Sequence, residues 1–266
     1  MVDRLDVDAV GRAMVEAHTV TIAPHFRSLS AGEIERSAAG EVVTVADRAC
    51  ERHLGPLLRD LVDGPILGEE AAAADPSLLD LVAAPGPVWL VDPIDGTADF
   101  ADGSPEYAVM VALLEGGVTV ASWILQPEFD RLAVAVRGGG ATIDGRPVTM
   151  TDPEPDPTTW RGVIKDRFVP EELRATVAGS GLGPSHRGGN CAGVEYPALV
   201  EGHHQFLFYW RTRPWDHAPG ALLATETGGR AIRPDGRDYR ADEPGDGLIV
   251  AHTSIVDVVA ERLLQV

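Results

Sequence analysis

Residues 89–100 read WLVDPIDGTADF, and this stretch decides the fold because it joins an apolar strand to two carboxylates in a tight turn. Asp92 and Asp95 lie three residues apart across a turn that Pro93 stiffens. Both carboxylates can therefore face one point, together with the carbonyl of Ile94. Hard divalent cations such as Mg²⁺ bind several oxygen ligands in near-octahedral geometry. The stretch predicts a metal site at the end of a buried strand.

The next residues favour anion binding at the same place. Gly96 lets the backbone approach a ligand closely. Free N–H groups at the start of a helix after Thr97 would attract an anion. The alternative is an ordinary Asx turn on a surface loop, because D-x-x-D-G is a common turn sequence.

Two further acidic segments favour the metal and phosphate site over a surface turn. Glu69 and Glu70 follow the apolar residues 65–67, so a second strand also ends in carboxylates. Residues 214–220, PWDHAPG, open a helix-like segment in which Asp216 occupies the N-cap position. Acidic groups at three such ends, each beside apolar sequence, predict one converging cation site.

These segments resemble the signatures of the inositol monophosphatase family of Mg²⁺-dependent, typically lithium-sensitive phosphatases. The family signatures are G-E-E after a strand, D-P-[IL]-D-G-T, and W-D-x-A-x-G at a helix start, and all three occur here in that order. Residues 42–47, VVTVAD, resemble the family's V-T-x-x-D. Residues 140–148 resemble its G-x-x-x-N-G-x-x-[IV] turn, with Asp144 for the usual Asn. The resemblance covers nearly the whole chain.

The resemblance implies a layered α-β-α-β-α sandwich of the inositol monophosphatase and fructose-1,6-bisphosphatase type, with the site between its two halves. Two or three Mg²⁺ ions, or Mn²⁺ as a substitute, would be held by Glu70, Asp92, the Ile94 carbonyl, Asp95 and Asp216. No covalent phosphoenzyme is implied.

The resemblance also assigns catalytic roles. Glu70 and Thr97, backed by Asp47, would activate the attacking water, and the amides of Gly96 and Thr97 would hold the phosphate. The alternative for Asp47 is an exposed acid early in a helix, where the helix dipole favours it.

The substrate pocket departs from the family pattern. The substrate contacts implied by the resemblance are Asp95, Gly96, Thr97, Cys191, Ala192, Tyr209 and Asp216. Tyr209 stands where polyol phosphatases of the family usually place a Glu, seven residues before the W-D aspartate. Residues 189–192, GNCA, replace the family's G-[ST]-A-A, and Arg36 stands near its usual Lys. The segment around Arg211 is more basic and bulkier than usual. We expect intact catalytic machinery with an altered alcohol pocket.

Three functions are compatible with the sequence. The first is a Mg²⁺-dependent phosphatase of a small polyol, amino-alcohol or sugar phosphate, with histidinol phosphate a rival to inositol phosphate. The second is a nucleotide 3′-phosphatase or bisphosphatase of the same superfamily. The third is a catalytically silent metal-binding or regulatory protein, against which the complete set of acidic ligands argues.

Composition limits the partners. The 266 residues carry 22 Lys and Arg against 41 Asp and Glu, a formal charge of −19, which argues against nucleic acid as a partner. Bound metal ions would still allow a small phosphorylated metabolite to bind. Only Cys50 and Cys191 occur, so we expect no disulfide framework and a cytoplasmic location. We expect no signal peptide, no membrane association and, from the resemblance, a homodimer.

The hydrophobic pattern predicts the order of elements. Two helices come first, the second over residues 44–61. Strands then dominate to residue 136, where residues 107–125 form a hairpin rather than a membrane span. Strands and helices alternate after residue 160. The Pro-rich and acidic residues 151–159 predict a boundary between an N-terminal subdomain, 1–150, and a C-terminal subdomain, 151–266.

Overall fold

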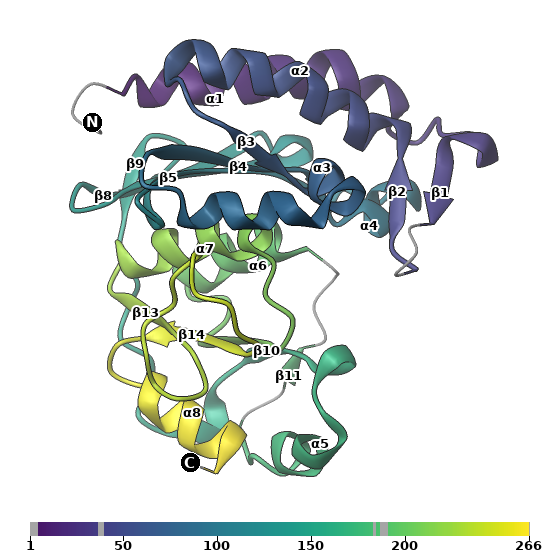
Figure 1. Cartoon of the computed structure of the whole chain (residues 1–266). Helices are drawn as coiled ribbons and strands as arrows, with labels where there is room; N and C mark the ends of the chain where they lie inside the picture. The colour runs from purple at the N-terminus through teal and green to yellow at the C-terminus, as the bar shows by residue number, and fades with distance from the viewer. Residues whose placement is uncertain (1–4, 37–39, 183–184, 187–190, 266) are drawn as a thin grey trace.

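Two β-sheets alternate with three layers of helices in the computed structural model of the chain, which describes residues 5–36, 40–182, 185–186 and 191–265. Figure 1 shows the five layers in order from top to bottom: α1 and α2, the first sheet, α6 and α7, the second sheet, and α5 with α8. The predicted α-β-α-β-α sandwich is confirmed.

The first sheet has seven strands in sequence order. They are β3 Ile66–Gly68, β4 Pro87–Asp95, β5 Ala108–Glu115, β6 Val118–Gln126, β7 Arg131–Val136, β8 Gly140–Ile143 and β9 Arg146–Val148. In this sheet β3 and β4 pair in parallel, and β4 to β9 form an antiparallel meander that includes the predicted hairpin. Strands β4 to β6 are buried along nearly their whole length, because helices cover both faces of the sheet.

Helices α1, Val7–Ala17, and α2, Val45–Leu61, cover the outer face of this sheet. Their apolar stripes pack on Trp89 and Trp123 in one cluster of buried residues. The first helix is shorter than its apolar pattern, because α1 passes into the π-helical turn His18–Ile22 before Pro24. A small hairpin, β1 Ile34–Arg36 and β2 Val42–Thr44, leads into α2.

Helices α6, Ala192–Val200, and α7, Pro214–Thr225, lie between the two sheets. Almost every residue of α7 is buried, because sheets lie on both of its sides. The two helices approach closely: a Cβ added at Gly220 would lie 2.1 Å from the Tyr196 ring. The sequence predicted Asp216 as the N-cap of α7, but Asp216 lies inside the helix. The helix begins two residues earlier at Pro214, which suits a first helical turn, and Arg213 is the N-cap.

The second sheet has the strand order β11-β10-β12-β14-β13. Its strands are β10 Gly162–Lys165, β11 Ser185–His186, β12 Phe206–Tyr209, β13 Gly229–Ile232 and β14 Leu248–His252. Helices α5, Glu171–Ala178, and α8, Val256–Leu264, cover its outer face. All four residues of β12 are buried, because helices cover both faces of this sheet.

The two sheets come from separate parts of the chain. The first ends at Val148 and the second begins at Gly162, which supports our proposal of subdomains 1–150 and 151–266. Two short helices, α3 Glu69–Ala74 and α4 Thr97–Ala101, follow strands β3 and β4 directly. Within the described residues, no helix is long and apolar enough to cross a membrane.

Candidate active site

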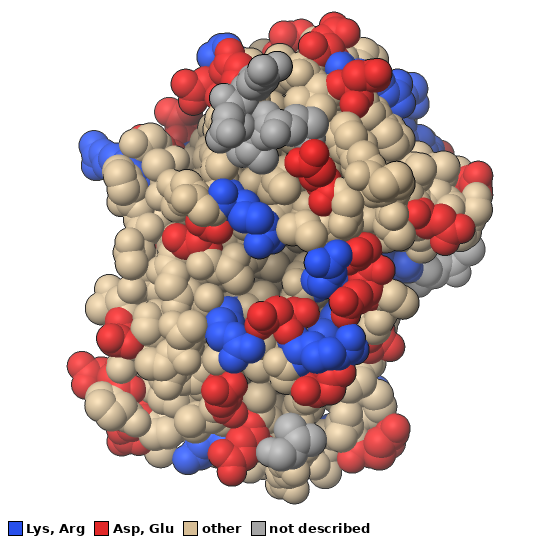
Figure 2. All heavy atoms as spheres, turned by 60° about the vertical axis from the view of Figure 1, so that its left-hand side comes forward, with Lys and Arg blue, Asp and Glu red and all other residues tan. Residues whose placement is uncertain are grey.

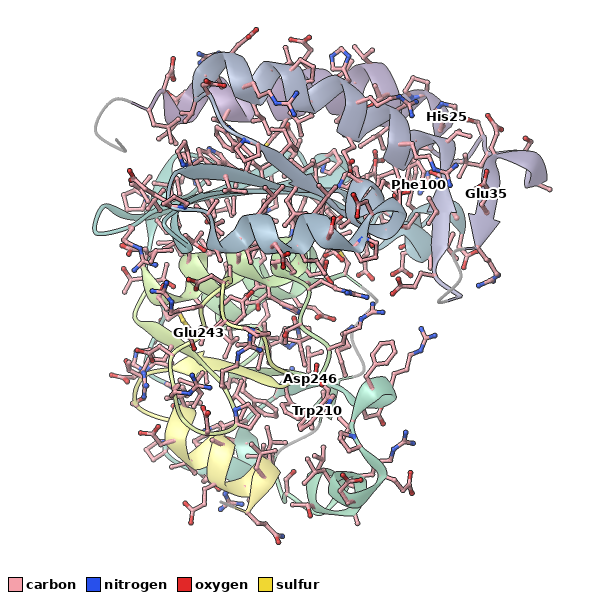
Figure 3. All side chains as sticks on the ribbon, in the orientation of Figure 1. His25, Glu35, Phe100, Trp210, Glu243 and Asp246 are labelled. Carbon is pink, nitrogen blue, oxygen red and sulfur yellow. The ribbon has the colours of Figure 1, made fainter. Side chains whose placement is uncertain are left out.

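A cavity of about 710 Å³ lies where the first sheet faces the second. Its upper wall comes from residues 34–36, 40–42 and 92–102, and its lower wall from residues 164–168 and 209–217. Figure 3 labels Glu35 and Phe100 on the upper half of the molecule and Trp210, which lines the cavity, on the lower half. The sequence motifs therefore meet at one place between the halves.

An irregularity in β4 directs two carboxylates to the same side. Asp92 pairs with Met110 of β5, and Asp95 pairs with Ala108, so β4 uses one more residue than its partner here. Residues three apart in a regular strand face opposite sides. The extra residue at Pro93 cancels that alternation and turns both carboxylates toward α6 and the cavity.

Glu69, rather than Glu70, is the glutamate of the G-E-E segment that lines the cavity. Strand β3 runs parallel to β4 with Gly68 beside Val91, so Glu69 follows one strand end and Asp92 the next. Oε2 of Glu70 instead lies 3.6 Å from Nε of Arg48 on α2. The sequence interpretation assigned Glu70 to the metal site, because spacing alone does not tell which of two adjacent acids turns inward.

Glu51 fixes this turn of the chain. Its carboxylate accepts hydrogen bonds from the amides of Glu70, at 2.9 Å, and Ala71, at 3.1 Å, and so caps the start of α3. A Cβ added at Gly68 would lie 2.1 Å from the Glu51 carboxyl group. The glycine before the two acids thus makes room for the cap that sets their direction.

Asp47 and Thr97 meet beside the cavity. Asp47 is 1 % exposed, so it is not the exposed acid of the alternative interpretation. It is the third residue of α2 and accepts from the amide and hydroxyl of Thr44, at 2.8 and 2.6 Å. The Thr97 hydroxyl lies 3.2 Å from Asp47 Oδ1 and 2.8 Å from the Ile94 carbonyl. Burial raises the pKa of Asp47 to about 6.

The carboxylates at the end of β4 raise one another's pKa. Burial, followed by the charge of Glu69, raises the pKa of Asp92 well above its usual range. Burial and then Asp216 do the same to Glu69. The pKa of Asp216 rises to about 8 through burial and the charge of Asp95, and burial raises that of Asp95 to about 6. A cation would relieve this repulsion.

The donor set fits a hard cation. Asp92 Oδ1 is buried without a hydrogen-bond partner in the described part of the chain, an arrangement that calls for a ligand. The neighbouring groups are carboxylates and one carbonyl, the oxygen ligands that Mg²⁺ prefers. Within residues 5–36, 40–182, 185–186 and 191–265, however, no three Asp, Glu, His or Cys side chains are already placed around one ion.

The turn after β4 is closely packed against α6. Gly96 has a φ of +84°, and a Cβ there would lie 3.0 Å from the Cys191 side chain and the Glu106 carbonyl. The amide of Gly193 donates to Asp95 Oδ2 at 2.6 Å. Ala192 lines the cavity, whereas Cys191 lies behind it with its thiol 3.4 Å from the Asp95 carbonyl. Residues 189 and 190 of this motif lie outside the described part.

Tyr209 lines the lower wall and belongs to a network that the sequence interpretation missed. Its hydroxyl donates to Glu195 Oε2 at 2.7 Å, and Glu195 Oε1 lies 2.6 Å from Nζ of Lys165. Glu195 is 4 % exposed, and its pKa rises to about 7 through burial, opposed by Lys165. Helix α6 supplies Glu195 and β10 supplies Lys165, so only the folded chain brings these residues to Tyr209.

Arg211 links the two walls of the cavity. It forms an ion pair with Glu41 of the upper wall, and its guanidinium lies 4.4 Å from the centre of the Phe168 ring on the lower wall. Its carbonyl lies 3.2 Å from Nε2 of His217, and Nδ1 of His217 lies 3.1 Å from the Tyr196 hydroxyl. His217 is buried, and burial lowers its pKa to about 3.

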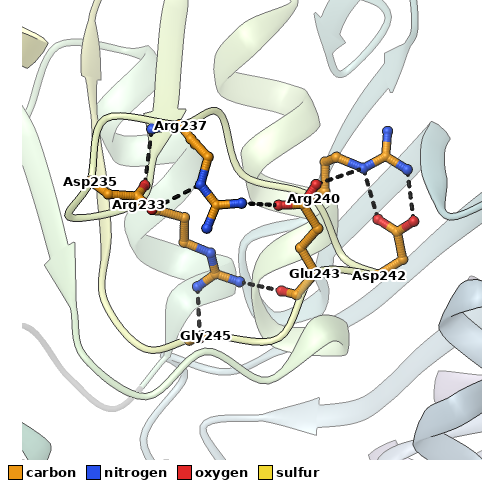
Figure 4. Close-up of polar contacts among 7 residues, drawn as sticks. All are labelled: Arg233, Asp235, Arg237, Arg240, Asp242, Glu243 and Gly245. Carbon is orange, nitrogen blue, oxygen red and sulfur yellow. Dashed lines mark hydrogen bonds and ion pairs between the residues drawn. The ribbon is translucent and has the colours of Figure 1, made fainter.

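Arg233 holds the turn that carries Arg211. Its Nη1 donates to Oγ1 of Thr212 at 2.9 Å and to the carbonyls of Gly245 and Gly247 at 2.9 and 3.1 Å. Figure 4 shows this side chain beside the exposed ion pairs of the loop 235–243. The guanidinium is nearly buried, so these carbonyls replace its water. Residues 210–213 are thereby fixed to the second sheet.

Acidic and basic side chains stand next to one another on the face shown in Figure 2, despite the excess of acids in the sequence. Several arginines of the chain have a carboxylate partner nearby in sequence, as in Arg240 with Asp242 at 2.7 Å.

Known proteins resemble this chain over most of its length. The inositol monophosphatase family matches residues 5–265. An inositol-1-monophosphatase, SuhB, of Mycobacterium tuberculosis is 30 % identical over 253 residues, 86 % of this chain and 79 % of that protein. The inositol monophosphatase of Dictyostelium discoideum is 26 % identical over 88 % of this chain and 86 % of its own. The structure of an inositol monophosphatase from Zymomonas mobilis superposes with a TM-score of 0.78 at 21 % identity, covering 97 % of each chain.

Proposed function

The chain belongs to the inositol monophosphatase family and is a phosphoric monoester hydrolase, and from this premise we propose that its cavity hydrolyses a small phosphorylated metabolite with Mg²⁺. The observation that carries the proposal is the irregularity in β4, which turns Asp92 and Asp95 to one side while leaving Asp92 Oδ1 without a partner. A cation bound beside Asp92 would give this oxygen a partner.

We assign the metal to Glu69, Asp92, the Ile94 carbonyl, Asp95 and Asp216, with Glu69 in the place first given to Glu70. Bound Mg²⁺ neutralises charge on the transferring phosphoryl group and makes a nearby water easier to deprotonate. Two or three ions, with Mn²⁺ as a substitute, remain part of the proposal.

The residues of the chain would position the attacking water. The Thr97 hydroxyl can accept a hydrogen bond from the water when its own proton lies toward Asp47, 3.2 Å away. Asp47, with a pKa of about 6, is ionised at neutral pH and can hold that proton. Glu69 would accept from the water on the other side, while the amides of Gly96 and Thr97 hold the phosphate oxygens.

A phosphate-release assay over a panel of esters tests the proposal. The panel should hold myo-inositol 1-phosphate, histidinol phosphate, sugar phosphates and a nucleoside 3′-phosphate, the last because a nucleotide phosphatase is the alternative. We expect release with Mg²⁺ or Mn²⁺, inhibition by Li⁺, and its loss in Asp95→Asn. Turnover that persists in excess EDTA would contradict the proposal. A homodimer and a cytoplasmic location complete it.

A further inference from the structure

The chain contains a single lysine, Lys165, against 21 arginines, and this lysine lines the cavity. Lysine and arginine are not interchangeable: an ammonium is a compact point charge, whereas a guanidinium is a broad, planar group. The one lysine therefore places a compact positive charge at the site.

The strand register points Lys165 into the site. Lys165 of β10 pairs with Tyr209 of the parallel strand β12, so both side chains leave the same face of the sheet. Val163, two residues before Lys165, belongs to the cluster of buried residues against α6 and α7. Lys165 and Tyr209 thus rise toward these helices, and both line the cavity.

Glu195 fixes the ammonium from behind. Its Oε1 lies 2.6 Å from Lys165 Nζ, and its Oε2 accepts the Tyr209 hydroxyl proton at 2.7 Å. Both carboxylate oxygens of Glu195 therefore have partners, and the only proton of the Tyr209 hydroxyl is already donated to Glu195. The Glu that polyol phosphatases of the family place at position 209 would accept hydrogen bonds from sugar hydroxyls. Here this wall of the cavity instead presents the Lys165 ammonium.

Arg211 brings a second cation to the same end of the cavity. Its guanidinium holds the Glu41 carboxylate across the cavity, which shows that an anionic group fits there. Lys165 and Arg211 line the same cavity as the proposed metal ligands Asp95 and Asp216. A phosphoryl group at the metal would therefore leave the rest of the ester between these two cations.

The charge of this lining differs from that of the chain. Outside the proposed metal ligands, the cavity is lined by four basic residues, Arg36, Lys165, Arg167 and Arg211, and three acidic ones, Glu41, Asp102 and Asp166. The chain as a whole has almost twice as many acids as bases. Three of the four bases, Lys165, Arg167 and Arg211, lie on the lower wall of the cavity.

We propose that Lys165, positioned by Glu195 and assisted by Arg211, binds a second anionic group on the leaving group, so that the substrate is a phosphate ester that also carries a carboxylate or another phosphate. This inference rests on the proposed function. Glu195 is a positioning residue: it holds the ammonium and does not touch the ester.

Matched esters test the inference. We would compare kcat/KM for 3-phosphoglycerate and glycerol 3-phosphate, which share a skeleton and differ in a carboxylate, and for fructose 1,6-bisphosphate and fructose 6-phosphate, which differ in a second phosphate. p-Nitrophenyl phosphate, with neither anion, reports the proposed function alone. We expect a preference of about ten- to a hundred-fold for an ester with the second anion, the scale of a hydrogen bond to a charged group. The pair that shows it identifies the anion as carboxylate or phosphate.

Two variants connect the preference to Lys165. Lys165→Met should bring the ratio close to one, mainly by raising KM for the anionic ester. Lys165→Met alone leaves the Glu195 carboxylate buried without its cation. The second variant therefore combines Lys165→Met with Glu195→Gln, whose amide oxygen still accepts from the Tyr209 hydroxyl. The control is Arg12→Met, which removes one exposed positive charge from α1 and should keep the wild-type ratio.

The outcomes separate the two proposals. If wild type hydrolyses p-nitrophenyl phosphate with Mg²⁺ but shows no preference in either pair, the proposed function stands and this inference is wrong. An equal loss on all esters in both Lys165 variants indicates a merely structural ion pair and overturns it too. If none of the esters is hydrolysed, the proposed function fails, and the inference fails with it.

Discussion

Replacing the two adjacent glutamates one at a time tests which of them binds the metal. Glu69→Gln and Glu70→Gln remove the same charge from neighbouring positions and keep nearly the same volume. Glu69 lines the cavity near Asp92, whereas Glu70 lies 3.6 Å from Arg48 outside it. We therefore expect Glu69→Gln to weaken Mg²⁺ binding strongly and Glu70→Gln to leave it nearly unchanged.

Ligand linkage gives the magnitude. At about 100 times its dissociation constant, Mg²⁺ stabilises the native state by about 2.7 kcal/mol. For a chain of this size, about 1 kcal/mol corresponds to roughly 2–4 °C in Tm, so wild type should gain roughly 5–10 °C. A site weakened about a hundred-fold gains only about 0.4 kcal/mol at the same concentration. Without Mg²⁺, Glu69→Gln should melt above wild type, because a repelling charge is removed from beside Asp92 and Asp216.

Thermal unfolding with and without MgCl₂, followed by circular dichroism at constant ionic strength, measures these shifts. NaCl at matched ionic strength controls for screening, and Glu70→Gln is the matched variant. If Glu70→Gln loses the Mg²⁺ shift while Glu69→Gln retains it, the inward placement of Glu69 is wrong and the original sequence assignment is right.

Three further results are expected. Wild type should be a mediocre myo-inositol 1-phosphatase, and Tyr209→Glu with Glu195→Gln should improve its kcat/KM for that ester relative to the preferred one by about 1–3 kcal/mol. Glu195 must be neutralised in this variant, because the new carboxylate would otherwise face it; an unchanged ratio would show that Tyr209 does not meet the leaving group. Because the pKa of His217 is lowered to about 3, the folded chain leaves this imidazole neutral as the pH falls below 6.5, whereas the unfolded chain protonates it. The folded state therefore loses stability on acidification. Between pH 7 and pH 5, the free energy of unfolding should fall by about 2 kcal/mol less in His217→Gln than in wild type. Urea unfolding measures this difference, because the carboxylates contribute equally in both proteins; identical pH dependence would refute the assignment. Arg233→Met should raise KM more than it lowers kcat, because it frees Thr212 and the turn beside the cavity; a change in stability with no change in KM would show that the turn is held by other contacts.

The sequence predicts much of the fold, because long apolar segments and the caps and turns beside them indicate where helices and strands begin and end. Residues 107–125 form the expected hairpin, and Thr44 caps the second helix as its position suggests. Shorter elements escape such patterns. Strands β8 and β13 have four residues each, too few for a period to show, and their pairing depends on neighbours that come from elsewhere in the chain.

The candidate site was predictable where chemistry is local and not where it depends on packing. The motif of residues 92–97 carries its acids and its turn in one segment. The choice between Glu69 and Glu70 depends instead on Glu51 of another helix. Lys165 has no motif around it. One signal was available, because it is the only lysine in a chain that otherwise uses arginine.

The single extra residue of β4 makes length, rather than composition, the sensitive property of this segment. Inserting one residue between Ala108 and Val109 of β5 would give β4 a regular partner and leave the pairing of β5 with β6 from Val109 onward unchanged. Asp92 and Asp95 would then be three residues apart in a regular strand, so Asp95 would face the apolar layer around Trp89 and Val91. A chain lengthened there could keep its sheet and lose its chemistry, whereas many substitutions at Pro93 itself should preserve both.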